Sequence, residues 1–375
     1  MRLYKMELYK LCHKKFFYTG TVFIIAFVLL YFFQTLHTAV STVDGIVYRG
    51  YAAVKTDRRI TEEFHGPLTG ETVQRIVDRY GLPDPDTDNA TFQNSSDSNF
   101  LNRFAMTYGT DNTSAVQTGN DIWLDYYDGW SMFTSMYFME MIMVSVLLLC
   151  MLTPVFSIEI LTRTKPLLFT TQNGPEKDTR AKIAAAFTIT IGLWSAITAL
   201  SLLLTGAVYG WEGLRCPAFL VEFYGAPGYA YGFYLIISLL LSLLGVLELC
   251  AIALAFSAYC RSPFHAAALT AACYMMPILC LTLLRTLYQI LSVSGLSYSA
   301  LFLWSRVLFC FHCLFIATPF FLSHQDIVVE IGAISNRTVY GPLLIVIFYA
   351  CMTILMCTAA AYRKYRKTFP ASSAQ

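Results

Sequence analysis

Long apolar runs alternate with polar segments along this chain. Six of the runs hold about 20 residues or more, which is the length that an α-helix needs to cross about 30 Å of hydrocarbon. The pattern therefore predicts an all-α polytopic membrane protein with six transmembrane helices. The predicted spans are residues 16–36, 131–158, 183–209, 231–257, 264–284 and 341–362.

A long polar segment, residues 37–130, separates the first two spans. It contains 14 acidic and 7 basic residues and no cysteine, so we predict a domain outside the membrane. Two short helices are predicted inside it, one in residues 68–83 with Thr69 as its N-cap and a second in residues 98–109. The stretch between them, residues 83–97, is rich in Asn, Asp and Ser and is predicted to be a loop.

Lys and Arg concentrate at the two ends of the chain and in the polar segment between the second and third spans. Short segments of this kind stay on the cytoplasmic side. Residues 1–15, 159–182 and 363–375 are therefore predicted to be cytoplasmic, and residues 37–130 external. With the turn at 259–263 also inside and the segments 212–229 and 285–340 also outside, the cytoplasmic segments carry 15 basic and 4 acidic residues, and the external segments carry 11 basic and 18 acidic residues. The chain is predicted to be a multi-pass protein of the cell membrane with both termini inside.

Residues 1–15 combine a helical spacing of Leu3, Met6 and Tyr9 with lysines at other positions. This pattern is typical of an amphipathic helix that lies at the membrane surface. A simple topology signal would have the same charges. Both interpretations place the segment in the cytoplasm.

Residues 285–340 contain an apolar stretch that is long enough to cross the membrane. One more crossing would place the basic carboxyl-terminal tail outside, against the positive-inside tendency. Arg306, His312 and Pro319 also make a poor lipid-facing helix. We therefore predict a re-entrant external hairpin before the sixth span.

The chain lacks the sequence signatures of common enzymes. It has no G-x-x-x-x-G-K-[ST] phosphate loop, no H-E-x-x-H and no G-x-S-x-G. It is therefore predicted not to be an enzyme and not to hydrolyse ATP by itself. Cys310 and Cys313 have CxxC spacing around His312, but a zinc site needs four ligands and Cys is also a common filler of membrane helices, so no metal is predicted.

Glu140 and Glu248 fall inside predicted spans. A carboxylate in a span costs several kcal/mol unless it faces protein or water, so both should point into the helix bundle. They are candidates for a translocation path. A structural hydrogen bond within the bundle is the alternative, and the sequence does not decide between them.

The segment that follows the second span resembles the cytoplasmic coupling loop of type-2 ABC-transporter permeases. In that family a membrane helix ends in an apolar-x-x-Glu step, and a short amphipathic helix then meets the ATPase. Arg163 and Pro175 depart from the family pattern. The opening KMELYKL and the stretch 332–367, with an outer Gly-containing segment before the last helix and a basic tail, add to the resemblance. The matching residues of the loop are Phe156, Glu159, Thr164, Leu167, Leu168, Gly174, Arg180 and Lys182.

The resemblance implies the permease subunit of a bacterial ABC exporter, which works by alternating access. It implies cytoplasmic ATPase subunits as partners, with ATP and Mg used there and no cofactor on this chain, and a second permease copy or a related permease. A nucleic-acid partner is not expected. The implied substrate is amphipathic or hydrophobic: a peptide, a lipid or a drug. The residues expected to couple to the ATPase are Glu159, Thr164, Leu167, Leu168, Phe169, Arg180 and Lys182.

A membrane-anchored sensor or assembly protein, whose external domain binds a ligand, is the alternative function. Two observations weigh against this alternative: the chain has more predicted spans than a membrane anchor needs, and the loop at 159–182 holds no signalling domain. An ATPase gene next to the gene of this chain would separate the two hypotheses. The sequence leaves open the substrate, the direction of transport, and whether the permease pairs with itself.

Overall fold

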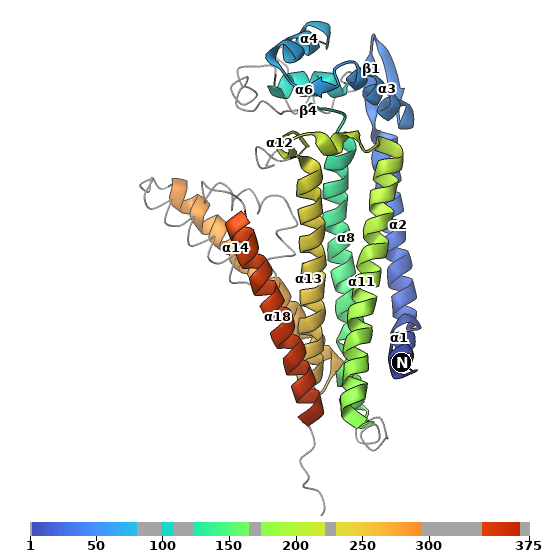
Figure 1. Ribbon diagram of the computed structural model, residues 1–375, viewed down its shortest axis with the longest axis vertical. Helices are drawn as coiled ribbons and strands as arrows, with labels where there is room; N and C mark the ends of the chain where they lie inside the picture. Colours follow the sequence, from blue (N-terminus) through green and yellow to red (C-terminus); the bar gives the residue numbers. More distant parts are fainter. Residues whose placement is uncertain are drawn as a thin grey trace, which may run out of the picture. The chain divides into compact units, whose positions relative to one another are not determined.

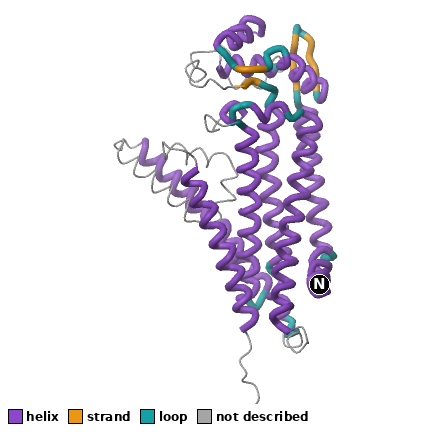
Figure 2. The backbone as a smooth tube through the Cα atoms, viewed as in Figure 1, coloured by secondary structure: helices purple, strands orange, loops and turns teal. Residues whose placement is uncertain are grey.

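The computed structural model describes residues 2–80, 99–108, 123–164, 174–221, 230–293 and 340–367. This part of the chain is mostly helical, with a few short strands (Figures 1 and 2). It divides into two compact units. The first unit comprises Met1–Ile25, Met139–Ile197 and Ser238–Gln375, and the second comprises Ala26–Phe138 and Thr198–Ile237.

Five helices in the described residues are long and apolar enough to cross a membrane, so the chain is a multi-pass membrane protein. They overlap the predicted spans at 16–36, 131–158, 183–209, 231–257 and 341–362. The predicted span 264–284 lies within α14 (Pro263–Val293), whose side chains are described only in part. The five helices carry the apolar stretches Lys15–Thr38, Asp128–Leu161, Glu176–Tyr209, Tyr231–Tyr259 and Val346–Arg366.

Small side chains let the membrane helices of the first unit pack closely. The first unit contains one part each of α2 (Lys15–Thr38), α8 (Asp128–Leu152), α11 (Gly174–Tyr209) and α13 (Tyr231–Tyr259). Ala185 and Ala186 of α11 and Ala253 of α13 are fully buried. A side chain at Gly20 of α2 would collide with Leu147 of α8. Close backbone approach at small residues is a usual means of helix packing in membranes.

The helix that begins at Asp128 is interrupted after Leu152. Pro154 starts a separate helix, α9 (Pro154–Leu161), because proline fits the first turn of a helix but supplies no N–H for a continuous one. The predicted span 131–158 therefore contains a break. Thr153, the N-cap residue of α9, makes no side-chain capping hydrogen bond.

Ser257 of α13 caps α9 from a different helix. Its buried Oγ accepts hydrogen bonds from the backbone N–H groups of Phe156 (2.9 Å) and Ser157 (3.1 Å), and donates one to the carbonyl oxygen of Thr153 (2.7 Å). The first N–H groups of a helix have no partner within the helix. This one hydroxyl therefore gives both N–H groups at the break a hydrogen-bond acceptor and joins α9 to α13.

α11 begins at Gly174, inside the segment 159–182 that the sequence analysis predicts to be a loop. Its first turns carry Glu176, Lys177 and Arg180, all exposed. Those charges mark where the chain leaves the apolar stretch, but they do not mark the end of the helix. Because charged residues are good helix formers, the helix continues past the membrane boundary.

The second unit contains the described part of the domain between α2 and α8, residues 39–127, here called the inserted domain. A β-hairpin opens it: β1 (Val40–Val43) pairs with β2 (Ile46–Arg49) in antiparallel register, with Val43 opposite Ile46. Asp44 and Gly45 form the two-residue turn, and both have positive φ. That is the type I′ geometry that favours Asp-Gly. The sequence analysis missed this hairpin.

Three helices and a second small sheet complete the inserted domain (Figure 1). The helices are α3 (Tyr51–Glu62), α4 (Gly70–Tyr80) and α6 (Phe100–Tyr108), and β3 (Gly66–Pro67) pairs with β4 (Trp123–Leu124). The predictions of α4 and α6 are confirmed, and Thr69 Oγ1 accepts the N-capping bond from Thr72 N at 3.2 Å. α3 was not predicted. The predicted loop at 83–97 lies outside the described residues. The buried core of this domain includes Val54, Ile60, Ile76, Leu101 and Phe104.

Asp57 is a buried carboxyl that holds the inserted domain together. Its Oδ1 accepts a hydrogen bond from Ser41 Oγ of β1 (2.5 Å) and from the backbone N–H of Phe100 of α6 (3.3 Å). Arg103 lies 3.8 Å from its Oδ2. Burial raises the pKa of Asp57 to about 6, and the hydrogen bond from Ser41 and the charge of Arg103 oppose that rise only in part.

The inserted domain is expected to lose stability as the pH rises from 4 to 6, with Asp57 as one cause. The folded pKa of about 6 exceeds the ordinary value of 3.8. Folding therefore favours the protonated form of Asp57. This stabilises the folded domain by about 3 kcal/mol below pH 3.8, the pKa in the unfolded chain, and the stabilisation is lost as the pH rises through the folded pKa of about 6. Asp57→Asn should remove the part of the pH dependence that Asp57 causes. Amide hydrogen exchange in α3 of the full chain, corrected for intrinsic rates, measures the opening free energy.

Asp78→Asn is the matched control, because Asp78 lies on the exposed face of α4 and accepts only a surface hydrogen bond from Gln74. This variant should keep the pH dependence of the unmodified chain. An equal fall in opening free energy in Asp57→Asn and the unmodified chain would show that Asp57 is not the group responsible.

Candidate functional site

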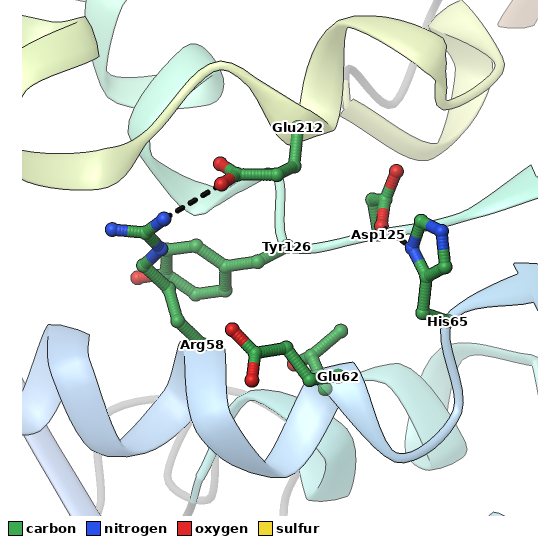
Figure 3. Close-up of a pocket in the computed structure, with 7 residues that line it drawn as sticks. Arg58, Glu62, His65, Asp125, Tyr126 and Glu212 are labelled. Carbon is green, nitrogen blue, oxygen red and sulfur yellow. Dashed lines mark hydrogen bonds and ion pairs between the residues drawn. The ribbon is translucent and has the colours of Figure 1, made fainter.

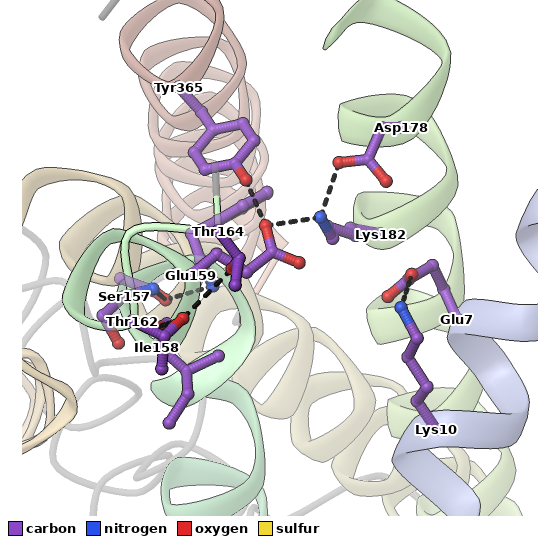
Figure 4. A network of polar contacts seen from close by, with 12 residues as sticks. Glu7, Lys10, Ser157, Ile158, Glu159, Thr162, Thr164, Asp178, Lys182 and Tyr365 are labelled. Carbon is purple, nitrogen blue, oxygen red and sulfur yellow. Dashed lines mark hydrogen bonds and ion pairs between the residues drawn. The ribbon is translucent and has the colours of Figure 1, made fainter. Parts of the chain in front are cut away.

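The described coupling residues Glu159 and Lys182 lie near the ends of two helices of the first unit, and a third helix end meets them. Glu159 is on α9, Lys182 is on α11, and α18 (Tyr340–Lys367) contributes Tyr365. Lys182 Nζ lies 2.7 Å from Glu159 Oε2 and 2.5 Å from Asp178 Oδ2 (Figure 4). Asp178 and Lys182 are one helical turn apart on α11, so they share a face. We call Glu159, Asp178, Lys182 and Tyr365 the Lys182 cluster.

Tyr365 completes the Lys182 cluster from the last helix. Its hydroxyl donates a hydrogen bond to Glu159 Oε2, as Figure 4 shows. Lys182 Nζ lies 5.4 Å from the centre of the Tyr365 ring, a cation–π distance. The ring in turn packs on Phe156, with 4.4 Å between ring centroids. The cluster therefore joins α9, α11 and α18 through both charge and aromatic packing.

The charges of the Lys182 cluster are buried. The side chain of Lys182 is 1% exposed, and those of Glu159 and Asp178 are 14% and 11% exposed. A buried ammonium is tolerated only when it is paired and hydrogen-bonded. The geometry meets that condition within the chain. Glu159 and Lys182 consequently contact each other, and neither can turn its charge toward another protein without breaking the cluster.

A second, exposed contact joins α11 to α18 beside the cluster. Arg180 pairs with Glu176 at 2.7 Å, and the hydroxyl of Tyr362 donates to the same Glu176 oxygen at 3.0 Å. The Arg180 guanidinium lies 5.9 Å from the centre of the Tyr362 ring. Because these groups are exposed, their pairing adds little to stability but leaves Arg180 accessible.

The remaining predicted coupling residues are only partly described. Thr164 Oγ1 lies 3.0 Å from Thr162 Oγ1 just after α9. Leu167, Leu168 and Phe169 lie outside the described residues.

The amino-terminal helix α1 (Arg2–Cys12) belongs to the same unit and lies near the cluster. Its Glu7 is buried and pairs with Lys10 at 2.5 Å. Burial lowers the pKa of Lys10, but the hydrogen bond to Glu7 and the charges of Glu7, Glu159 and Asp178 outweigh it, so the pKa is raised. Tyr4 also donates a hydrogen bond to Thr188 of α11 at 2.9 Å.

The sequence could not have predicted Tyr365 as a member of this site. It lies in the basic stretch RKYRK, which reads as a topology signal, and 206 positions separate it from Glu159. An aromatic residue placed inside a basic helix end is the only hint that the sequence offers. Asp178 was also missed, although its spacing of four from Lys182 permits an ion pair on a helix.

Glu140 of α8 and Glu248 of α13 are both fully buried in the first unit. Neither carboxyl oxygen of Glu248 makes a hydrogen bond of normal geometry to a described residue. Thr353 of α18 is its polar neighbour, but the Thr353 hydroxyl donates to the carbonyl oxygen of Tyr349 at 3.0 Å. Glu248 thus lacks the well-formed hydrogen bond that a purely structural role would require of it.

The described residues contain no group of three or more His, Cys, Asp or Glu side chains arranged to hold a metal ion. Cys310, His312 and Cys313, the one metal-like spacing in the sequence, lie outside those residues, as does most of the predicted external hairpin at 285–340. Comparisons of the chain with known protein families, with curated proteins and with solved structures found no match.

Proposed function

We propose that this chain is the membrane-spanning permease subunit of an ATP-driven ABC exporter, driven by separate cytoplasmic ATPase subunits. The observation that supports this most is the Lys182 cluster. It ties the helix before the predicted coupling loop, α9, to the helix after it, α11, and to α18. A push on the loop between α9 and α11 would therefore reach three helices at once.

The proposed mechanism assigns different work to the two groups of predicted coupling residues. Leu167, Leu168 and Phe169 form an apolar contact for a groove on the ATPase, and exposed Arg180 fixes its register. Glu159 and Lys182 act inside the chain, where they transmit the displacement to α11 and α18. ATP and Mg bind to the partner, and ATP hydrolysis there drives alternating access. This chain holds no cofactor.

The full proposal includes features beyond the five described spans. α14 supplies a sixth crossing at 264–284, residues 37–130 face outward, and residues 285–340 form an external re-entrant hairpin. Both termini and the Lys182 cluster are cytoplasmic, in the plasma membrane of a bacterium. A second permease copy, or a related permease, completes the transporter.

Glu140 and Glu248 are proposed to line the path of an amphipathic or hydrophobic substrate, which would be a peptide, a lipid or a drug. Glu248 favours this interpretation, because its carboxyl is buried without a well-formed hydrogen bond among the described residues. In the outward or inward state, water or substrate would supply the missing partners.

Leu168→Asp tests the proposal through the ATPase contact. The variant places an unpaired charge in an apolar contact, so we expect capture of the ATPase subunit to weaken at least about ten-fold. The measurement is affinity capture of the ATPase encoded beside this chain, co-expressed with the tagged full chain. Insertion into the membrane should be unchanged, because the loop lies outside hydrocarbon.

Gln172→Asp is the control, since it adds the same charge to the same loop but outside the apolar triplet. It should capture the ATPase as the unmodified chain does. Equal capture by all three chains would remove the loop from the coupling role, and absence of capture by the unmodified chain would contradict the proposed function itself.

A further inference from the structure

A hollow in the second unit combines positive and negative side chains at the place where a membrane helix ends. It lies between α3 and the segment that follows α11, including the short helix η1 (Glu212–Arg215), as Figure 3 shows. The hollow has two connected parts, of about 270 and about 470 Å³, which share Arg58, His65, Asp125 and Glu212. We call it the Arg58 pocket.

The Arg58 pocket opens at the level of the membrane surface. Its larger part is lined by Gly206, Gly210 and Trp211, and the apolar stretch of α11 ends at Tyr209. Trp211 is half exposed, and tryptophan is enriched at the height of lipid headgroups. Phospholipid headgroups are therefore the ligands to consider for this pocket.

Two glycines keep the pocket open. A side chain at Gly206 would collide with the indole of Trp211, and one at Gly210 would collide with Glu212 and Arg58. Gly210 also has a φ of 88°, which side chains disfavour. The turn after α11 can therefore bring Trp211 and Glu212 back over the helix end and against α3.

The positive side chains of the pocket are available to an anion. Arg58 pairs with Glu212 at 2.7 Å, but the side chains are 31% and 50% exposed, so the pair contributes little stability. Arg215 is exposed and makes no ion pair with a described residue. Guanidinium groups bind phosphate through two parallel hydrogen bonds. A phosphate could replace Glu212 on Arg58 at small cost and reach Arg215 as well.

The negative side chains are available to a cation. Asp125 Oδ1 is bonded to His65, but its buried Oδ2 accepts no hydrogen bond of normal geometry from a described residue. Trp123 lies beside this carboxyl, yet its indole Nε1 likewise makes no such bond. Glu62 is exposed and extends from α3 along the pocket wall (Figure 3). Once Arg58 turns to a phosphate, Glu212 becomes a third acceptor.

We propose that the Arg58 pocket binds the headgroup of a zwitterionic phospholipid of the ethanolamine type, with its phosphate on Arg58 and Arg215 and its ammonium facing Glu62 and Asp125. A purely anionic headgroup would leave Glu62 and Glu212 without a cation and Asp125 with His65 alone, and a purely cationic ligand would meet two guanidinium groups. At about 30 Å³ per water molecule, even the smaller part of the pocket holds about nine waters and so accommodates a compact headgroup. This site does not depend on the proposed ATPase and can be measured on the permease alone.

The test is binding of short-chain phosphatidylethanolamine to the full chain in maltoside micelles, followed by calorimetry. Arg215→Gln and Glu62→Gln alter exposed side chains and should leave the fold intact. Each should weaken binding about ten-fold, because each removes a charge-assisted hydrogen bond. Arg79→Gln, an exposed change on α4 outside the pocket, should bind as the unmodified chain does. Short-chain phosphatidylglycerol should bind at least ten-fold more weakly than phosphatidylethanolamine.

Soluble glycerophosphoethanolamine separates the headgroup from its chains. Its competition for the same site would support the proposal and place the affinity in the headgroup. Phosphatidylethanolamine bound equally by the pocket variants would mean that the acyl chains alone hold it, and would overturn the proposal. Binding of phosphatidylglycerol as tightly as phosphatidylethanolamine would also overturn the proposal. Binding of a dipeptide to the Arg58 pocket in place of the lipid would overturn it as well.

Discussion

Replacing Lys182 with methionine is expected to lower the free energy of unfolding by about 3–5 kcal/mol. The side chain is 1% exposed and is bonded to two carboxylates that are themselves largely buried. Methionine keeps the apolar stem but leaves Glu159 and Asp178 without a cation, so one of them must become protonated or take up water. The change can be followed as thermal unfolding in detergent with a thiol-reactive dye, in a background in which the exposed Cys150 and Cys351 are replaced by serine, because Cys216 and Cys250 are buried in the folded chain.

Arg180→Met provides the matched control, two residues away on the same helix. Arg180 is exposed and pairs with exposed Glu176, so this variant should melt close to the unmodified chain. The triple change Lys182→Met, Glu159→Gln and Asp178→Asn should recover much of the lost stability, because it leaves no buried charge unpaired. If Lys182→Met melted like Arg180→Met, the cluster would not be a buried tie between the helices.

Ser257→Ala is expected to destabilise the chain by about 2–4 kcal/mol, which is more than a serine usually contributes. The hydroxyl caps two N–H groups at the start of α9 and donates to the carbonyl oxygen of Thr153. Alanine would leave the two N–H groups without this acceptor, since Thr153 makes no side-chain cap of its own, whereas the Thr153 carbonyl oxygen still accepts a hydrogen bond from Ser157 Oγ at 2.6 Å. Thermal unfolding with the same dye measures the loss, and hydrogen exchange should show faster opening at Phe156 and Ser157.

Ser135→Ala is the control for this prediction. Ser135 is exposed on α8 and donates only to the carbonyl oxygen of Ser131 one turn earlier. It should melt within about 0.5 kcal/mol of the unmodified chain. Equal melting of the two serine variants would mean that water or a rearranged α9 satisfies the break, and that Ser257 does not join α9 to α13.

The membrane helices were predictable because each needs only a local run of apolar residues. Local signals also sufficed for α4, where Thr69 caps the helix. The β1–β2 hairpin carries an equally local signal, Asp44-Gly45, but its strands are only four residues long and lie in an acidic segment whose composition is typical of loops. α3 was missed because charged residues interrupt its apolar spacing.

The sequence predicted which segment contains the site residues, but it did not predict which of them contact one another. Glu159 and Lys182 were named from the sequence, but their pairing depends on α11 starting at Gly174 rather than after the loop. The Tyr365–Glu159 hydrogen bond joins positions that are 206 residues apart, and the Arg58–Glu212 pair joins positions that are 154 residues apart. No single stretch of sequence carries such contacts, because they form only when the helices pack.

The sidedness of the coupling segment is the claim on which the proposed function rests most directly. It can be measured by labelling Ser95→Cys and Gln172→Cys, each in a cysteine-free background, with a membrane-impermeant thiol reagent in intact cells. The account predicts that Ser95→Cys is labelled in intact cells and that Gln172→Cys is labelled only after the membrane is permeabilised. Labelling of Gln172→Cys in intact cells would place the coupling segment outside, away from any ATPase, and would contradict the account.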